Sequence, residues 1–441
     1  MTVHYFNPGH ETAVLNGSKY YQPSRRIAKM QEDLALLPVW YAEPEDYVMV
    51  KGKRYKVKGT RPDFFTFHPE PFTFYPEPVE LWGISPQAIH YFDTLNNQYG
   101  WQLQIPEWKE EYRFLGSRFA AQKALASLMK AIPEIEKDIL PQFYSTVEDI
   151  ENQTSLRGRS PKQSRENQQD WIASLQAARN DDAIFSPFVF PPLSDKFIIK
   201  SPYSSSGRGL LWLSPGKLPQ SERQIISGML KKQSQVSLEK ALDKQLDFSM
   251  HFEITQEKET RFTGYSVFQT NVKGAYESSL LTNQEILEKQ ITDLIDKRLL
   301  QKVQKTLTWI LHEMYAPYYI GNLGVDMLVY FSGNQFRLNP CVEINMRKSM
   351  GYLAIRLFEN HICPTSQGLF FVEYHKTSQT LNEKHIALQK QYPLQIKNNK
   401  ICSGYLNLCP VTETTNYSAY VIVRAKPEAA VLKVAVVIAS P

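Results

Sequence analysis

Hydrophobic and polar positions alternate with strand and helix periods along the first hundred residues. Residues 3–6 form a short apolar run that ends at the turn signal Asn7-Pro8-Gly9, which predicts a strand. Apolar residues then recur at helical spacing after Ser24, whose hydroxyl suits a helix N-cap. Alternating strands and helices indicate a small parallel α/β domain. Its other predicted elements are strands at residues 38–41 and 79–82 and a helix at residues 86–99.

The middle of the chain continues this mixture. Residues 197–200 and 210–213 read as two strands joined by a Ser/Gly-rich tip, which predicts a hairpin. Residues 151–170 are polar, and we expect them to form a mobile surface loop. The other predicted elements are helices at residues 119–129 and 284–314 and strands at residues 236–239, 248–254, 322–330 and 419–424.

A short run near residue 345 alternates apolar and polar side chains. In a strand, Glu343, Asn345 and Arg347 would point to one face, with Val342, Ile344 and Met346 buried on the other. Carboxylate and amide oxygens beside a cation suit a magnesium ion that carries a phosphate chain. A same-face ion pair between Glu343 and Arg347 explains this run equally well.

The preceding strand carries one acid, Asp326, inside an apolar run. A buried carboxylate needs a partner, because an unpaired charge is costly in a core. A metal ion shared with Glu343 and Asn345 would supply that partner.

Composition indicates an ordinary globular protein. The chain has 441 residues, a hydrophobic content of 42% and a net charge of only +5, which gives no case for a nucleic-acid partner. We find no apolar signal region at the N-terminus and no run long enough to span a membrane. The cysteines Cys341, Cys363, Cys402 and Cys409 lack the spacing of a zinc site, and we expect buried free thiols in a soluble cytoplasmic protein.

The loop between the strands of the predicted hairpin has the residues of a phosphate-binding segment. Backbone N–H groups and hydroxyls can donate to phosphate oxygens, and glycine permits close approach. Lys200 ends the entering strand and would add a point charge, and Arg208 lies within the loop. The loop matches neither the dinucleotide-binding fingerprint nor the P-loop.

The order of these elements resembles the ATP-grasp superfamily, which includes biotin carboxylase, D-alanine–D-alanine ligase and many carboxylate–amine ligases. The resemblance runs from about Gly116 to about Gly351. It implies an α/β protein in which an ATP-grasp fold follows a small pre-ATP-grasp α/β domain. The implied domains are residues 1–112, the ATP-grasp module at 113–377 and a C-terminal extension at 378–441. Within the module, the lid lobe would span about 125–238 and the metal-binding lobe about 239–377.

The resemblance also implies roles for individual residues. Glu239 and Leu242 look like the hinge that meets ribose and adenine, and Asp326, Glu343 and Asn345 look like the metal ligands. Arg118 stands where the family often has a nucleotide-binding lysine; it keeps the charge but not the compact geometry. The implied lysine and lid loop are Lys200, Ser204, Ser205, Ser206, Gly207, Arg208 and Gly209.

The implied cofactors are ATP and Mg²⁺, and the implied reaction is ligation of a carboxylate to an amine or thiol through an acyl phosphate. Lys200 and Arg347 would be the catalytic residues, and no nucleophilic side chain is needed. Cys341 has no histidine to activate it, so we interpret it as packing. His10 would contact the acceptor substrate or, more simply, belong to a polar turn.

Two other functions stay open: a non-catalytic ATP-binding scaffold, and a small-molecule kinase. The expected partners are small-molecule or peptide carboxylates and amines, with no nucleic acid and no membrane. A homodimer is the oligomeric state to test, since dimers are the commonest oligomers.

Overall fold

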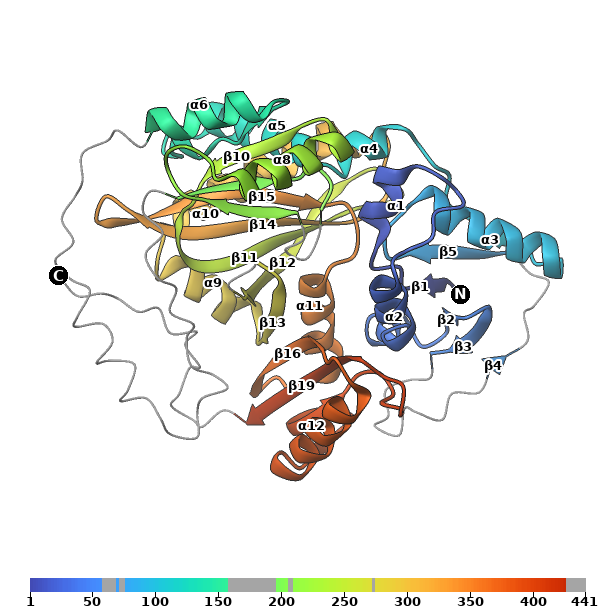
Figure 1. Cartoon of the computed structure of the whole chain (residues 1–441). Coiled ribbons are helices and arrows are strands. Elements are labelled where there is room, and N and C mark those ends of the chain that lie inside the picture. Colours follow the sequence, from blue (N-terminus) through green and yellow to red (C-terminus); the bar gives the residue numbers. More distant parts are fainter. Residues whose placement is uncertain (58–68, 71–75, 158–195, 205–208, 272–273, 426–441) are drawn as a thin grey trace.

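Three β-sheets organise the chain in the computed structural model, which describes residues 1–57, 69–70, 76–157, 196–204, 209–271 and 274–425. The sheets have six, four and nine strands, and helices pack against them (Figure 1). The expected α/β class is therefore confirmed. No helix within the described ranges is both long and apolar enough to cross a membrane.

The six-stranded sheet is built from the N-terminal residues. Its strands β1, β2, β5 and β6 pair in parallel, and β3 and β4 add an antiparallel edge. The strands are β1 (Val3–Tyr5), β2 (Tyr47–Val50), β3 (Lys53–Lys56), β4 (Pro69–Glu70), β5 (Glu77–Leu81) and β6 (Leu103–Gln104), in the order β4-β3-β2-β1-β5-β6. The accompanying helices are α1 (His10–Asn16), α2 (Arg25–Asp33), η1 (Leu37–Trp40), α3 (Pro86–Tyr99) and α4 (Glu111–Leu115).

Local signals in this region gave both correct and incorrect elements. The Ser24 hydroxyl accepts from the backbone N–H of Ile27, so the predicted N-cap is confirmed. Residues 38–41 were predicted as a strand, and this is wrong: they belong to the 3-10 turn η1 and its C-cap. The Tyr41 N–H donates to the carbonyl of Pro38 at 3.1 Å. Because every residue of this turn is buried, its apolar run carries no period that separates strand from helix.

The four-stranded sheet has its own core and two covering helices. Its strands are β7 (Gln142–Tyr144), β10 (Val236–Lys240), β8 (Phe197–Lys200) and β9 (Leu210–Leu213), in that order. The helices are α6 (Val147–Arg157) and α8 (Gln220–Gln233), and η2 (Lys137–Ile139) precedes β7. Strands β8 and β9 form the predicted hairpin. The predicted loop at 151–170 is wrong for residues 151–157, which are helical, and the rest of it lies outside the described residues.

The nine-stranded sheet forms the centre of the molecule. Its order is β15-β14-β11-β12-β13-β16-β19-β18-β17. Its strands are β11 (Asp243–Ile254), β12 (Thr260–Thr270), β13 (Tyr276–Leu281), β14 (Gly321–Ser332), β15 (Gln335–Asn345), β16 (Ser366–Tyr374), β17 (Gln395–Lys397), β18 (Lys400–Asn407) and β19 (Tyr417–Ala425). Its helices are α5 (Arg118–Ala131), α9 (Gln284–Thr292), α10 (Lys297–Tyr315), α11 (Met350–His361) and α12 (Ser378–Gln391).

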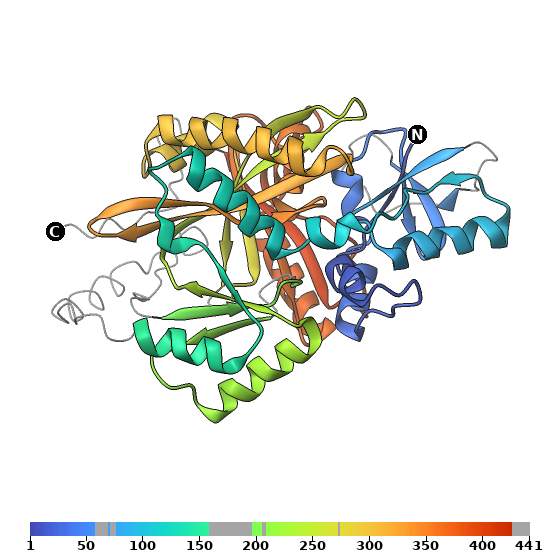
Figure 2. The same ribbon diagram turned by 90° about the horizontal axis from the view of Figure 1, so that it is seen from above.

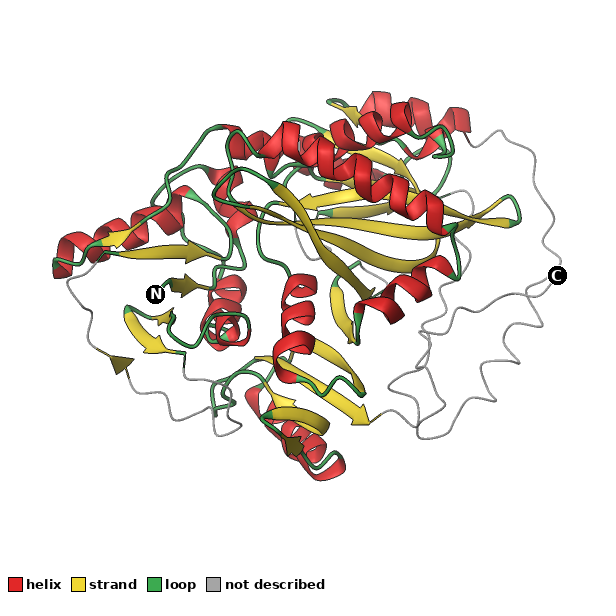
Figure 3. Cartoon of the chain, turned by 180° about the vertical axis from the view of Figure 1, so that it is seen from behind, coloured by secondary structure: helices red, strands yellow, loops and turns green. Residues whose placement is uncertain are grey.

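Two long helices, α5 and α10, pack side by side on this sheet, α5 against β15 and α10 against β11 and β12. Figure 2 shows α5 and α10 next to each other, and Figure 3 shows α10 across the sheet from behind. The predicted helix at 284–314 is two helices, α9 and α10. Asp296 caps the second one, because its carboxylate accepts from the Arg298 N–H at 2.6 Å.

The C-terminal strands share a hydrophobic core with the N-terminal helices. Trp40 donates its indole N–H to the Leu408 carbonyl at 2.8 Å. The Asp33 carboxylate accepts from the backbone N–H groups of Asn416 and Tyr417 at 2.8 and 3.0 Å. The two ends of the described chain are therefore held together by both apolar and polar contacts.

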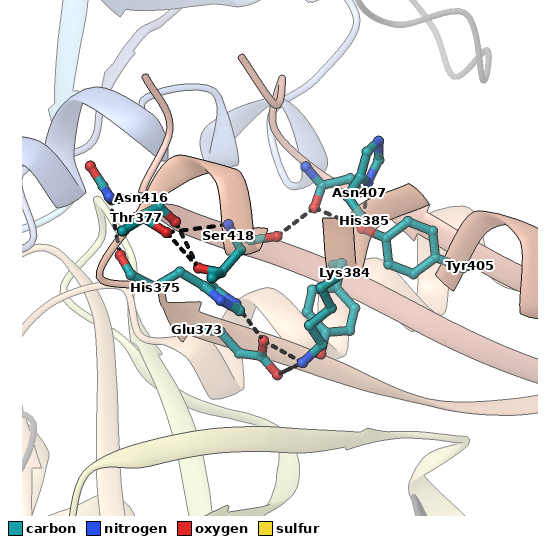
Figure 4. A network of polar contacts seen from close by, with 11 residues as sticks. Glu373, His375, Thr377, Lys384, His385, Tyr405, Asn407, Asn416 and Ser418 are labelled. Atoms are coloured by element: carbon teal, nitrogen blue, oxygen red, sulfur yellow. Dashed lines mark hydrogen bonds and ion pairs between the residues drawn. The ribbon is translucent and has the colours of Figure 1, made fainter. Parts of the chain in front are cut away.

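A polar network fixes α12 on the last strands (Figure 4). Glu373 accepts from Lys384 at 2.6 Å and from the Tyr420 hydroxyl at 2.6 Å. Ser418 donates to the Asn407 side chain at 2.8 Å. These hydrogen bonds join protein side chains to one another, so we interpret the network as one that stabilises the packing of α12 on the sheet.

The cysteines differ from the prediction at two positions. Cys363 and Cys402 form a disulfide between the end of α11 and β18, whereas Cys341 and Cys409 are buried free thiols. The prediction of four free thiols is wrong because these two residues, 39 positions apart in sequence, meet only through tertiary packing.

Candidate active site

Asp326 and Glu343 lie directly opposite each other on the antiparallel strands β14 and β15. The register shifts just after this pair, between Asp326 and Leu328, where the β15 strand bulges. The bulge turns Val342 toward the cleft and Cys341 toward α5, where its thiol lies 3.5 Å from the Ala121 carbonyl. The predicted burial of Val342 on the opposite face is therefore wrong, and Cys341 packs as expected.

The Asp326 carboxylate is held by two neighbouring side chains. Ser249 donates its hydroxyl to Oδ1 at 2.6 Å, and Asn345 donates its amide to Oδ2 at 3.0 Å. Burial, followed by the negative charge of Glu343, raises the pKa of Asp326 to about 6. The site thus opposes the negative charge of Asp326.

These residues fit a divalent cation. Hard cations such as Mg²⁺ prefer carboxylate, amide and water oxygens, and a cation would remove the repulsion between Asp326 and Glu343. Within the described chain, no group of three or more His, Cys, Asp or Glu side chains is arranged for a metal ion. Asn345 would therefore complete the donor set, as the sequence predicted.

Two arginines place positive charge near Asp326 and Glu343. They are Arg118, which is remote in sequence, and Arg347, which follows Glu343 by four residues. Arg118, at the start of α5, lies 3.1 Å from the Glu343 carboxylate and 3.4 Å from the Ser204 hydroxyl. Arg347 donates its Nε–H to Glu11 of α1 at 2.8 Å. The N-terminal unit thus supplies the carboxylate that holds Arg347.

The side chain of Glu11 is mostly buried, with 11% of its area exposed. Burial raises its pKa, but the positive charges of His10 and Arg347 outweigh that effect, and the pKa of Glu11 lies well below its ordinary value. His10 sits 3.2 Å from the same carboxylate and packs over Gly83. His10 therefore has a further role beyond the two predicted ones, since it lies beside the carboxylate that pairs with Arg347.

Two adjoining cavities make one continuous cleft between the four-stranded and nine-stranded sheets. A cavity of about 240 Å³ is lined by the predicted metal ligands and by the predicted cationic residues beside them. These residues are Asp326, Glu343, Asn345, Arg118, Lys200 and Arg347. A second cavity of about 360 Å³ is mainly apolar. Both are lined by Lys200, Leu210, Asp247, Thr270, Gly274, Leu328 and Val342.

The apolar end of the cleft holds the predicted hinge residues. Strand β10 ends at Lys240 and β11 begins at Asp243, so Leu242 lies on the short connection between the two sheets. Leu242 and Trp212 line the cavity together with Glu239. A planar, largely apolar group could be enclosed here between the sheets.

Lys200 lies where the two cavities meet. Its ammonium donates to Glu239 at 2.5 Å, and Ser237 donates to the other oxygen of the same carboxylate at 2.9 Å. Gly209, at the end of the loop, has a φ of 74° that favours glycine, and its carbonyl accepts from Ser201 at 3.0 Å. The predicted loop residues Ser205, Ser206, Gly207 and Arg208 lie outside the described residues.

Several residues of the cleft were not predicted from the sequence. Asp247 accepts from the Thr270 hydroxyl at 3.0 Å, and both residues line the two cavities. Asp247 also pairs with Lys244, which lines the apolar cavity. Asp247 shared the strand alternation of Ser249, which could have indicated that both face the cleft. Glu11 carried no local signal, because its partner Arg347 is remote in sequence.

No protein-family model and no curated protein sequence match the chain. Solved structures do resemble it over most of its length. N5-carboxyaminoimidazole synthetase from Staphylococcus aureus, complexed with ADP, has 14% identity and a TM-score of 0.39, covering 78% of this chain and 76% of that one. Biotin carboxylase from Campylobacter jejuni has 10% identity and a TM-score of 0.43, covering 78% and 70%.

L-amino acid ligase from Bacillus licheniformis has 10% identity and a TM-score of 0.37, covering 79% of this chain and 76% of that one. With TM-scores below 0.5, these likenesses decide nothing about function, which depends on the residues of the cleft.

Proposed function

We propose that this protein is an ATP- and magnesium-dependent ligase that joins a carboxylate to an amine or thiol through an acyl phosphate. The observation that carries the proposal is the opposed pair Asp326 and Glu343, with Asn345 beside them, in the same cleft as Lys200 and Arg347. An ordinary sheet-surface ion pair does not account for this arrangement, because Arg347 pairs with Glu11 and not with Glu343.

The cleft has separate regions for the parts of ATP. Leu242, Trp212 and neighbouring apolar side chains would enclose the adenine, and Glu239 would meet the ribose. Lys200 would then release Glu239 and contact the phosphates, since it lines both cavities. Arg118, beside Ser204 and Glu343, would add a second phosphate contact.

Asp326, Glu343 and Asn345 would hold Mg²⁺, which as a Lewis acid offsets charge that develops on the transferred phosphoryl group. Ser249 orients Asp326 through its hydrogen bond. Arg347 would steady the substrate carboxylate as it attacks the γ-phosphate, and the amine would then displace phosphate from the acyl phosphate. The loop that Ser204 and Gly209 flank would exclude water.

We propose a pre-ATP-grasp domain at 1–112, an ATP-grasp module at 113–377 and an extension at 378–441, acting on small-molecule or peptide substrates in the cytoplasm. The Cys363–Cys402 disulfide is the feature that speaks against a reducing compartment. A homodimer is proposed only as the commonest oligomeric state.

The first experiment measures nucleotide binding through Trp212, which lines the apolar end of the cleft. ATP should change the tryptophan emission of the wild type, magnesium should strengthen binding, and Trp212→Phe should lose most of the signal while calorimetry still detects binding. Absence of ATP binding to the wild type by calorimetry would reject the proposal.

A second experiment separates ligase, kinase and scaffold. ADP release that depends on both a carboxylate and an amine supports the ligase. A phosphorylated small molecule as the end product would identify a kinase, and tight ATP binding without turnover of any acceptor would identify a scaffold.

A further inference from the structure

A second polar cavity lies outside the cleft, at the junction of the N-terminal unit and the nine-stranded sheet. Its volume is about 360 Å³, and no residue that lines it also lines the two cavities of the cleft. The lining comes from residues in and next to β1, from the segment 41–46 that follows η1, and from β5, β11, β12, β14 and α11. Glu80, which lines this cavity, pairs with the buried Lys348, whose neighbour in sequence, Arg347, lines the cleft.

The side chains that line this cavity carry more negative than positive charge. Five carboxylates line it, whereas its cationic side chains are His4 and Arg356. Arg356 lies at the rim, 3.0 Å from Glu359 and 3.9 Å from Glu43, so it neutralises part of the outer charge. The carboxylates are Glu43, Asp46, Glu80, Glu253 and Glu359.

His4 balances only the inner carboxylates. Its ring nitrogens lie 3.0 Å from Asp46 and 2.9 Å from Glu80. Burial lowers the pKa of His4, but the bonds to these two carboxylates raise it more, so the net pKa is raised. Glu253 lines the cavity and lies beyond ion-pair distance of the other described side chains, and its charge interacts with that of Arg261.

Tyr41 gives the second and independent indication of a ligand. Tyr41 is only 4% exposed and lines the cavity. Its hydroxyl has no hydrogen-bond partner among the described residues. A buried hydroxyl without a partner costs free energy, so such groups are normally satisfied by protein, water or a bound ligand.

The rings around the cavity already receive an ammonium group. The Lys348 ammonium lies 5.1 Å from the centre of the Tyr41 ring and 5.9 Å from that of Tyr352. Aromatic faces attract ammonium ions through the ring quadrupole. The same two tyrosines line the cavity, so aromatic surface and carboxylates occur together there.

We propose that this cavity binds a small organic cation through a primary ammonium group, held by the Tyr41 hydroxyl, Glu253 and the Asp46–Glu80 carboxylates. An ammonium ion needs only hydrogen-bond acceptors and aromatic faces, which the cavity provides. The inference rests on this cavity alone and goes beyond the proposed ligase reaction.

The test is calorimetric titration of the full chain with methylammonium, putrescine and spermidine at constant ionic strength, without ATP or magnesium. We expect saturable binding of at least one amine. Tyr41→Phe removes only the hydroxyl oxygen and should weaken that binding about tenfold, because hydrogen bonds to charged groups are among the stronger ones. Glu253→Gln should weaken it to a similar extent.

The matched control is Glu313→Gln, which removes an exposed carboxylate on α10 outside the cavity and should leave amine affinity unchanged. If Tyr41→Phe fails to fold, Glu253→Gln decides the outcome, since Glu253 is an exposed residue. The proposal is overturned if no amine binds saturably, if Glu313→Gln weakens binding as much as Glu253→Gln, or if neither cavity variant changes the affinity. Because ATP is absent from the titration, none of these results depends on the ligase proposal.

Discussion

Asp326 and Glu343 face each other across one pairing of β14 and β15, and this pairing works against the stability of the metal-free protein. Two opposed carboxylates repel each other, and burial adds to the cost at Asp326. The strands therefore hold a charge arrangement that a divalent cation would relieve. This is the relationship on which the proposed function depends.

Glu343→Gln should separate the structural and metal-binding effects of this pair. Without magnesium, the stability of the variant should stay close to that of the wild type, because relief of the repulsion with Asp326 is opposed by loss of the charged contact with Arg118. With magnesium at about 100 times its dissociation constant, the wild type should gain roughly 2.7 kcal/mol and the variant little. Thermal unfolding of both proteins at matched ionic strength measures these changes in stability. The reference is the same buffer with a chelator and no added magnesium.

The same variant should lose about a hundredfold or more in ligase turnover. Glu313→Gln, which is remote from the cleft, should respond to magnesium as the wild type does. Equal stabilisation of wild type and Glu343→Gln by magnesium would reject the metal assignment.

The Glu11–Arg347 pair should behave as a coupled buried ion pair. Its side chains are 11% and 17% exposed, so removal of one partner leaves a poorly solvated charge. Glu11→Ala and Arg347→Met should each destabilise the protein by about 3 kcal/mol, and the double variant should cost clearly less than the sum. Urea unfolding of the four proteins measures the coupling.

An additive double variant would show that the contact contributes little. The exposed pair Lys289 and Asp293 on α9 is the control, because surface pairs of this kind contribute only about 0.3–0.5 kcal/mol.

His251 should make stability depend on pH. Burial lowers its pKa to about 3, from an ordinary value of 6.5, and its Nε2 lies 2.8 Å from the Ser266 hydroxyl. The unfolded chain binds a proton at a higher pH than the folded one, so the contribution of His251 is complete above pH 6.5. It is lost progressively as pH falls from 6.5 toward 3, at up to roughly 1.4 kcal/mol per pH unit.

Urea unfolding at pH 7 and pH 5 tests this. Between these values, the wild type should lose about 2 kcal/mol more than His251→Gln. His312→Gln, which changes an exposed histidine of α10, should follow the wild type. The same profile for all three proteins would contradict the assignment.

The sequence predicted those helices and strands whose capping residues, turn residues and hydrophobic period lie within the element itself. The N-cap Ser24 and the helix Pro86–Tyr99 were found because their signals lie within a few residues. The prediction of residues 38–41 failed because a fully buried apolar run has no distinguishing period. Asp326 and Glu343 could be proposed as site residues from the sequence because an acid in an apolar strand is itself unusual.

Other features depend on contacts between remote segments, which periodicity does not report. The bulge that turns Val342 into the cleft depends on how β15 pairs with β14. Glu11 became recognisable only when the N-terminal unit was placed against Arg347. The cavity at Tyr41 likewise requires the η1 turn, β5 and α11 to meet.

The disulfide gives a prediction that also bears on the compartment in which the protein works. Cys363 and Cys402 close a loop with a sequence separation of 39, and the bond restricts the unfolded chain. Replacing both by serine should cost about 4 kcal/mol in the chain-entropy estimate. Thiol titration of the unfolded wild type should find two reactive groups, Cys341 and Cys409, without reductant and four after reduction. Reductant should lower the unfolding midpoint of the wild type and leave that of the double variant unchanged. Four reactive thiols in the protein purified without reductant would instead restore the free-thiol prediction and remove the objection to a reducing cytoplasm.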